Sequence, residues 1–166
     1  MNFMNKLSFA ALTALIALSG QLNAAELQHR LGVGYSSTDF EALGVSFGYG
    51  NGIKLEYGYD FNQIAGMHVS YEQNKDGILK GDTFKLGGDI GYTFEFDEAS
   101  IKPFISGGFY SYEENFYDDS GLYWGLGARA TYKNFYIDLR QDFFEMKDQG
   151  ISVDMEQFAV TLGIRL

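Results

Sequence analysis

Hydrophobic and polar residues alternate at the end of this chain. From Phe158 to Leu166 every second residue is large and apolar, and small or polar residues such as Thr161 and Arg165 lie between them. Because successive side chains of a β-strand point to opposite faces of its sheet, this pattern predicts a strand with one apolar and one polar face. The apolar face turns inward in a soluble β-protein and outward to lipid in a membrane barrel.

The same two-residue period recurs in seven further segments, which are separated by turn-forming residues. In segment 101–112 the pattern does not decide which residues share a face, because Gly107 and Gly108 are typical of a β-bulge. The eight predicted strands cover residues 27–35, 53–61, 65–71, 84–96, 101–112, 122–132, 135–142 and 158–166. Long connections (37–52, 74–82, 113–120 and 145–153) alternate with short turns (62–63, 97–100 and 133–134). Bacterial outer-membrane barrels have this alternation, with short turns in the periplasm and longer loops outside.

Segment 43–49 also alternates, with Val45, Phe47 and Tyr49 as apolar positions. As a membrane strand it would raise the number to nine, and single-chain bacterial barrels have an even number of strands. We therefore interpret 37–52 as the first outer loop, with 43–49 extending a hairpin above the membrane. A ten-stranded barrel is the alternative. The predicted fold class is an all-β, eight-stranded, antiparallel, up-and-down transmembrane β-barrel.

The first 24 residues have the features of a secretory signal peptide. Lys6 precedes an apolar run from Leu7 to Leu18, and small residues lead up to Ala24. The run is shorter than the ~20 residues that a membrane-spanning helix needs. We expect cleavage after Ala24, which leaves 142 residues as one outer-membrane domain, 25–166. The chain has no cysteine, so the sequence predicts neither a disulfide nor a metal–thiolate site.

Charge and aromatic content narrow the class of protein. The formal net charge is −10, and the loss of Lys6 with the signal peptide makes it −11, which argues against a nucleic-acid partner. Aromatic residues at the ends of the predicted strands favour a membrane barrel, because aromatic belts mark both membrane interfaces. They are Phe61, Phe94, Phe96, Tyr132 and Phe135 near the short turns, and Tyr35, Tyr71 and Trp124 near the loops.

Charged residues of both signs lie on the polar face of the predicted strands. The interior of an eight-stranded barrel is just wide enough to be filled by side chains. We therefore expect these residues to form a paired polar network in the lumen rather than to line a pore. Its predicted members are Lys54, Glu56, Asp60, His68, Glu72, Lys85, Asp89, Glu95, Arg129, Asp138, Arg140 and Arg165, with Asp142 on the same face.

Three stretches, 57–62, 102–110 and 158–166, resemble the small outer-membrane β-barrel proteins of the OmpA/OmpX-like, surface-antigen type. The resemblance covers the whole mature chain. It implies residence in a Gram-negative outer membrane among lipid and lipopolysaccharide, and a non-enzymatic envelope role with loops available for adhesion or a host surface ligand. It also implies that the last strand is the signal read by the barrel assembly machinery, although the family usually ends in an aromatic residue. The residues of that signal are Phe158, Val160, Leu162, Ile164 and Leu166.

One group of residues on a single strand suggests catalytic chemistry. His68, Ser70 and Glu72 share a strand face, and these residue types together suit acyl transfer. Lipid A deacylases are similar in carrying His-x-Ser, but Asn follows there and Tyr71 follows here. Because the three residues lie on the lumen face, we interpret them as part of the interior network. A lipid A-modifying acyl hydrolase and a narrow channel for small solutes remain the alternative functions.

The sequence predicts no cofactor and no metal site. The chain has two histidines and no cysteine, which is too few ligands for a transition-metal site. The acidic loops lack the spacing of a calcium-binding loop, so we interpret them as solvated.

Overall fold

The computed structural model describes residues 29–42, 45–76, 79–114, 117–148 and 151–166. The predicted signal peptide, 1–24, lies outside the described residues. The strands are β1 (His29–Ala42), β2 (Val45–Asp60), β3 (Ala65–Asp76), β4 (Leu79–Gly91), β5 (Phe94–Phe96), β6 (Ala99–Glu114), β7 (Tyr117–Tyr132), β8 (Phe135–Asp148) and β9 (Ile151–Arg165). In this part of the chain, no helix has the length and apolar character needed to cross a membrane.

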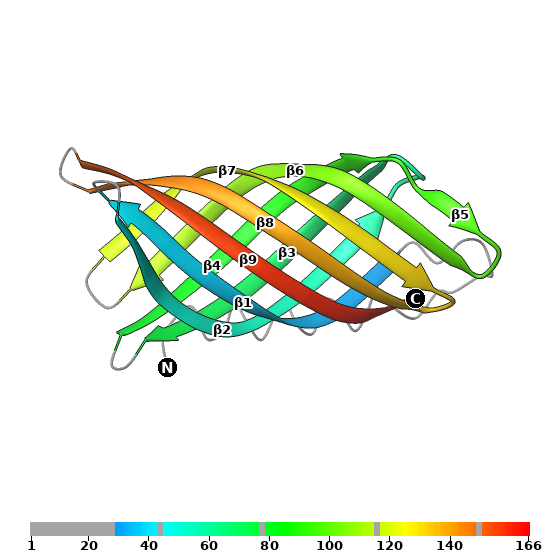
Figure 1. Ribbon diagram of the computed structural model, residues 1–166, viewed down its shortest axis with the longest axis horizontal. Coiled ribbons are helices and arrows are strands. Elements are labelled where there is room, and N and C mark those ends of the chain that lie inside the picture. Colours follow the sequence, from blue (N-terminus) through cyan, green and yellow to red (C-terminus); the bar gives the residue numbers. More distant parts are fainter. Residues whose placement is uncertain (1–28, 43–44, 77–78, 115–116, 149–150) are drawn as a thin grey trace.

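The strands close into a barrel (Figure 1). The order β4-β3-β2-β1-β9-β8-β7-β6 is antiparallel throughout, and pairing of β4 with β6 completes the ring. The three-residue strand β5 pairs with β6 alone and lies beyond the ring. The barrel therefore has eight strands, which confirms the predicted fold class.

All three short turns lie at one end of the barrel, which we name the turn end (Figure 1). Asp97 and Lys133 begin two of them with φ angles of 47° and 52°, in the left-handed region that two-residue hairpin turns require. In the third, the side-chain oxygen of Asn62 accepts hydrogen bonds from the backbone N–H groups of Ile64 and Ala65, both at 2.8 Å. Local turn chemistry thus sets the register of the hairpins that join there.

At the opposite end, which we name the hairpin end, the strands are longer than the sequence pattern predicts. Most residues of the predicted loops 74–82, 113–120 and 145–153 are paired β-strand. The prediction was wrong because pairing uses backbone groups, whereas the two-residue period stops where both faces become polar. Residues 45–49 are the upper part of β2 paired with β1, so the predicted hairpin is confirmed and the ten-stranded alternative is wrong.

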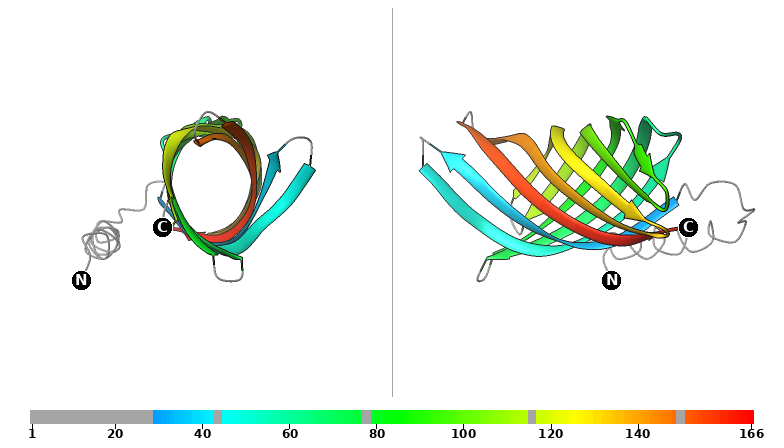
Figure 2. Two further views of the ribbon diagram at one scale, coloured as in Figure 1. Left: turned by 90° about the vertical axis from the view of Figure 1, so that its left-hand side faces the viewer. Right: turned by 45° about the vertical axis from the view of Figure 1, so that its right-hand side comes forward.

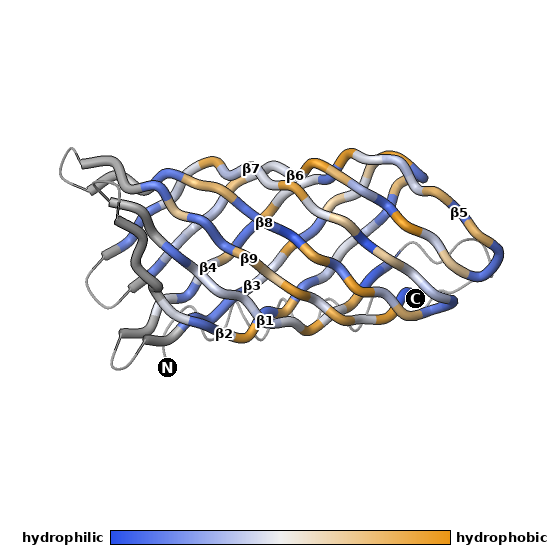
Figure 3. Tube along the Cα trace, in the orientation of Figure 1, coloured by the Kyte–Doolittle hydropathy of each residue, from blue (hydrophilic) through white to orange (hydrophobic). Residues whose placement is uncertain are grey.

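The two faces of the wall differ in chemistry, as the alternating colours along each strand show (Figure 3). The outward positions carry exposed apolar side chains, including Val33, Leu55, Ile90, Ile105, Leu126, Leu139 and Leu162. The aromatic residues predicted for the two belts are also exposed. A soluble monomer does not expose apolar surface of this extent, so the wall faces lipid.

Inward-facing glycines make room for tyrosines in the lumen. A Cβ at Gly32 or Gly163 would lie 2.3 Å or 2.5 Å from the ring or hydroxyl of Tyr136, and one at Gly87 would lie 2.1 Å from the Tyr123 hydroxyl. Each glycine therefore lets an aromatic side chain from another strand lie flat against the wall. The bulge considered at Gly107–Gly108 is absent, since β6 pairs with β4 and β7 without a register shift there.

Candidate functional site

Twelve charged side chains fill the lumen, and they form two clusters. Three cations and three carboxylates make up each cluster, so each is formally neutral. The turn-end cluster is Arg30, Asp60, Asp89, Lys102, Arg129 and Asp138, contributed by six different strands. The central cluster is Lys54, Glu56, Glu72, Lys85, Arg140 and Asp142, contributed by β2, β3, β4 and β8. Among the described side chains, no ion pair joins the two clusters.

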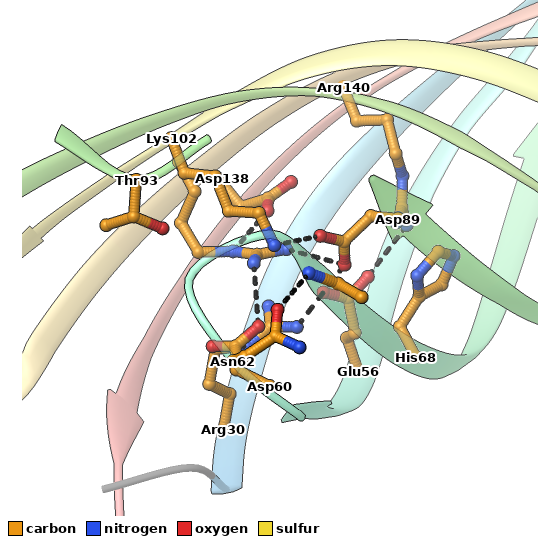
Figure 4. A network of polar contacts seen from close by, with 12 residues as sticks. Arg30, Glu56, Asp60, Asn62, His68, Asp89, Thr93, Lys102, Asp138 and Arg140 are labelled. Carbon is orange, nitrogen blue, oxygen red and sulfur yellow. Dashed lines mark hydrogen bonds and ion pairs between the residues drawn. The ribbon is translucent and has the colours of Figure 1, made fainter. Parts of the chain in front are cut away.

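Arg129 is the hub of the turn-end cluster. Its guanidinium lies 2.9 Å from a carboxylate oxygen of Asp138, 3.3 Å from Asp60 and 3.6 Å from Asp89. Lys102 donates a hydrogen bond of 2.6 Å to the other oxygen of Asp89, and Arg30 Nε lies 3.0 Å from Asp60. Figure 4 shows the labelled members of this cluster, Arg30, Asp60, Asp89, Lys102 and Asp138, converging from different strands.

In the central cluster, Arg140 and Lys54 share one oxygen of Glu56, at 2.7 Å and 2.8 Å. Lys85 lies 2.6 Å from Asp142 and 3.8 Å from Glu72. Arg140 also approaches Asp142, at 3.4 Å, which links the two halves of the cluster. A charge removed from water is tolerated when it is paired and hydrogen-bonded, and this arrangement supplies a partner for every charge.

Above the central cluster, toward the hairpin end, the lumen is filled by aromatic and apolar side chains. Tyr110, Tyr112, Tyr123, Phe144 and Met155 form one buried group. The ammonium of Lys85 lies 5.3 Å from the centre of the Tyr123 ring and 5.4 Å from that of Phe144, within cation–π range.

On the facing wall, a chain of uncharged polar groups rises from the same lysine. Lys85 donates to the side-chain oxygen of Gln157, whose amide donates to Thr38 at 2.8 Å. Asn74 also donates to Thr38, at 2.9 Å, and accepts from Ser36 at 2.9 Å. The four uncharged residues of this hydrogen-bonded chain, Ser36, Thr38, Asn74 and Gln157, are all buried. Side chains therefore occupy the lumen from the turn end to the level of the hairpins.

Most residues predicted for the lumen lie in these clusters, and three do not. His68 is buried in the lumen but is bonded to Tyr123 rather than to either cluster. Glu95 is exposed and accepts a hydrogen bond from Gln63 at 3.1 Å. The prediction was wrong there because β5 pairs with one neighbour beyond the closed ring, so neither of its faces looks into the lumen. Arg165 is half-buried at the turn end, outside both clusters.

Sequence reasoning also missed two cations of the turn-end cluster. Arg30 alternates with Leu31 and Val33, so the two-residue period predicts that its side chain faces the lumen. Lys102 was missed because the Gly107–Gly108 pair left the faces of its strand undecided.

The His68, Ser70 and Glu72 constellation is not assembled as a catalytic triad. His68 Nε2 lies 2.6 Å from the hydroxyl of Tyr123, and Ser70 donates to Glu72 at 3.3 Å. No hydrogen bond between His68 and Ser70 occurs among these described residues, and all three side chains are buried in the lumen. Within the described ranges, no three His, Asp or Glu side chains gather as a metal site would require.

A closed barrel with a lipid-facing wall and a charged, self-neutralised lumen is the architecture of an outer-membrane β-barrel protein. The chain belongs to the outer membrane protein beta-barrel domain family, which matches residues 8–165. Its location is therefore the outer membrane, where lipid surrounds the wall.

Solved structures show the same fold. Ail, the attachment invasion locus protein of Yersinia pestis, is 21% identical with a TM-score of 0.52, over 84% of this chain and 99% of that one. Neisserial surface protein A is 11% identical with a TM-score of 0.60, over 83% and 97%. The outer membrane enzyme PagL is 13% identical with a TM-score of 0.59, over 82% and 99%. These identities establish the fold alone. No curated protein matches the chain in sequence.

Proposed function

We propose that this protein is a non-enzymatic, non-conducting surface barrel whose hairpins make contacts outside the cell, in adhesion or with a host surface. The filled lumen carries this proposal, since two neutral clusters and an aromatic layer leave the hairpins as the free part of the molecule. Barrels of this class have short turns in the periplasm and longer connections outside. The hairpin end is therefore the outer end.

The charge of the hairpin end indicates the chemistry of the contact. Residues 36–52, 73–83, 111–121 and 144–156 contain twelve Asp and Glu and three Lys. Ail has been solved with the heparin analogue sucrose octasulfate, a polyanion. A polyanion would be repelled by the hairpins of this chain, because their charge has the same sign. We therefore infer a basic partner.

Removal of the hairpins tests the proposal. Each of the four hairpins is cut back to a short turn at the level where its strands leave the lipid. Heat-modifiable migration on gels then shows whether the barrel has folded. We expect at least one folded variant to lose attachment of cells to a host surface. Unchanged attachment after all four deletions, with folded barrels, would contradict the proposal.

The channel alternative is less well supported, because a solute would have to part ion pairs such as Lys85–Asp142 and displace the aromatic layer above them. We expect no current steps above background when the barrel is reconstituted in a planar bilayer. A steady single-channel conductance that Arg140→Ala enlarges would favour the channel.

The hydrolase alternative rests on His68, Ser70 and Glu72, with fold likeness to an enzyme beside it, and a shared fold does not carry a function. His68 is bonded to Tyr123 inside the lumen, away from acyl chains. We expect Ser70→Ala to leave the mass of lipid A in cells unchanged. A change in the mass of lipid A when Ser70 is replaced would support the hydrolase alternative.

Recognition of the last strand by the barrel assembly machinery is also a proposal. The apolar positions of this strand lie on its outward face, with Phe158, Leu162 and Ile164 exposed. We expect Leu166→Phe, which restores the aromatic end usual in the family, to increase the assembled fraction in cells. Leu162→Phe is the matched control, because it adds the same ring away from the end and should have no such effect.

A further inference from the structure

At the turn end, the hairpin of β5 and β6 reaches beyond the closed ring. In the ring each strand has a neighbour on both sides, and the end-on view in Figure 2 shows the closed wall. The pairing of β4 with β6 stops at Gly91↔Phe104, because the next residue of β6 is Pro103, which has no N–H to donate. β5 then pairs with β6 down to Phe96↔Ala99. The β5–β6 hairpin therefore extends further than the other turns, at the right-hand end of Figure 1.

The β5–β6 hairpin is tied to the turns on both sides of it. On one side, the backbone N–H of Thr93 donates to the carbonyl oxygen of Gln63 at 3.0 Å, and the Gln63 side chain donates to Glu95 at 3.1 Å. On the other side, the backbone N–H of Lys133 donates to the carbonyl oxygen of Glu98 at 2.8 Å, and the two side chains form an ion pair at 3.2 Å. These bonds fix the direction in which the faces of the hairpin point.

The outward face of this hairpin continues the lipid-facing wall. Large apolar side chains occupy every second position and are all exposed, at Ile90, Tyr92, Phe94 and Phe96. The rings of Tyr92 and Phe94 pack edge to face, with centres 5.1 Å apart. Glu95 lies between the two phenylalanines in sequence, so its side chain points to the opposite side of the strand. The hairpin thus has one aromatic and one polar face.

The apolar surface is taller along this strand than along others. From Phe84 to Phe96, twelve positions rise by about 30 Å at ~3.3 Å per residue and a strand tilt of ~40°. On β9, the eight positions from Phe158 to Leu166 rise by about 20 Å in the same way. The apolar band of an outer-membrane barrel is about 25 Å tall. An upright barrel would therefore leave Phe96 in water or draw polar turns into hydrocarbon.

We propose that the outward face of the β5–β6 hairpin binds phospholipid of the inner leaflet, and that the barrel leans in the membrane so that Phe94 and Phe96 enter the headgroup region. Tilting is a common response to an apolar surface that is too long for its bilayer. This inference does not depend on the proposed function, because it concerns the opposite end of the molecule.

Phospholipid is the occupant because the face is continuous with a surface that already meets lipid. Apolar patches that bind proteins are typically rimmed by polar residues. Here the outward positions from Ile90 to Phe94 contain no charged or amide side chain, since only Tyr92 lies between them. Tyrosine itself is enriched where membrane meets water, with its ring in lipid and its hydroxyl in the headgroups.

Tryptophan reporters test the lipid contact in the full mature chain, in vesicles of phosphatidylethanolamine and phosphatidylglycerol. Trp124→Phe first removes the native tryptophan. F96W then places a reporter on the aromatic face, and E95W places one on the polar face of the same hairpin. We expect lipids spin-labelled at the headgroup to quench F96W at least about twofold more than E95W, and aqueous acrylamide to quench the two in the reverse order.

Two double variants test the lean of the barrel, read from polarised infrared spectra of oriented bilayers. F94S/F96S removes two exposed rings from the hairpin. F61S/F135S is the matched control, because it removes two equally exposed rings at the level of the ordinary turns. We expect F94S/F96S to reduce the lean by about half or more and the control to preserve it. Heat-modifiable migration shows which variants have folded.

Three results would overturn the proposal. They are stronger acrylamide quenching of F96W than of E95W, an equal change of lean in the two double variants, and self-association of the barrel that F94S/F96S abolishes, which would assign the face to a second copy. If F94S/F96S does not fold, the comparison of F96W with E95W still decides the question. Loss of attachment after hairpin deletion bears on the proposed function alone, so the two proposals can fail separately.

Discussion

Gly87 illustrates how single residues decide the packing of the lumen. The hydroxyl of Tyr123 reaches across this glycine to His68, and a Cβ there would lie 2.1 Å from that hydroxyl. Similar close approaches occur at Gly58, under the guanidinium of Arg30, and at Gly127, under the ring of Phe104. At this scale, glycines that leave room for a neighbouring ring or guanidinium matter as much as the groups that they accommodate.

Gly87→Ala should therefore destabilise the barrel. We expect a loss of about 1–3 kcal/mol, typical of overpacking, measured by urea unfolding in detergent micelles. Gly107→Ala is the matched control, because its Cβ would meet only the backbone oxygen of Tyr123 at 3.5 Å, an ordinary contact. Equal losses for the two variants would show that Tyr123 does not pack over Gly87.

Arg129→Met tests the hub of the turn-end cluster. It removes the shared partner of Asp60, Asp89 and Asp138 and leaves carboxylates crowded in a buried site. We expect a loss of about 3–5 kcal/mol in the free energy of unfolding. Lys133→Met breaks an exposed ion pair with Glu98 and should cost less than about 1 kcal/mol. A small effect at Arg129 would mean that water reaches the cluster.

At the scale of elements, each strand is divided into a membrane part and an outer part. In the membrane part the two-residue period separates lipid-facing from lumen-facing side chains. In the outer part the pairing continues without that period, as in residues 145–148 of β8. One continuous strand thus serves two environments, because backbone hydrogen bonds are satisfied in the same way in both.

Trp124 reports on the membrane part of β7. It is the single tryptophan of the chain, it is exposed on the outer wall, and it stacks on Phe143 with ring centres 4.5 Å apart. Since it lies toward the hairpin end of the apolar zone, spin-labelled lipids with the label near the headgroup should quench its fluorescence more than mid-chain labels do. Aqueous acrylamide should quench it weakly. Strong quenching by acrylamide, with weak quenching by both lipid labels, would place the residue in water.

Across the whole molecule, charge is separated by environment. The two lumen clusters are each neutral, so the net negative charge resides on the hairpins and the turn end. This distribution keeps the interior charges paired, while the surface of the hairpins has a strong field of one sign.

The two clusters should behave as separate units. We expect the losses from Lys102→Met and Lys54→Met to add within about 0.5 kcal/mol, because the residues share no partner. Lys102→Met and Asp89→Asn should couple by about 0.5–3 kcal/mol, since the two side chains are bonded at 2.6 Å. The measurement is a double-mutant cycle of unfolding in micelles. Coupling between Lys102 and Lys54 would reveal a link across the lumen.

The local pattern of the sequence determined the membrane part of each strand and its two faces, and the aromatic residues at the strand ends then favoured lipid on the apolar side. The pattern did so because side-chain direction in a strand depends only on position along the chain, so the alternation around Val33, Leu55 or Leu162 can be read without any partner. The same reasoning assigned most charged residues to the lumen. It failed at Glu95, whose face depends on whether its strand has a second neighbour.

Only the tertiary structure decided which charges meet. Arg140 bonds to Glu56 and Lys85 bonds to Gln157 across the closed barrel, between residues far apart in the chain. Ring closure and strand register set these pairs, and neither is a local property. The length of the hairpins arises in the same way, because pairing of backbone groups continues or stops according to where a neighbouring strand ends.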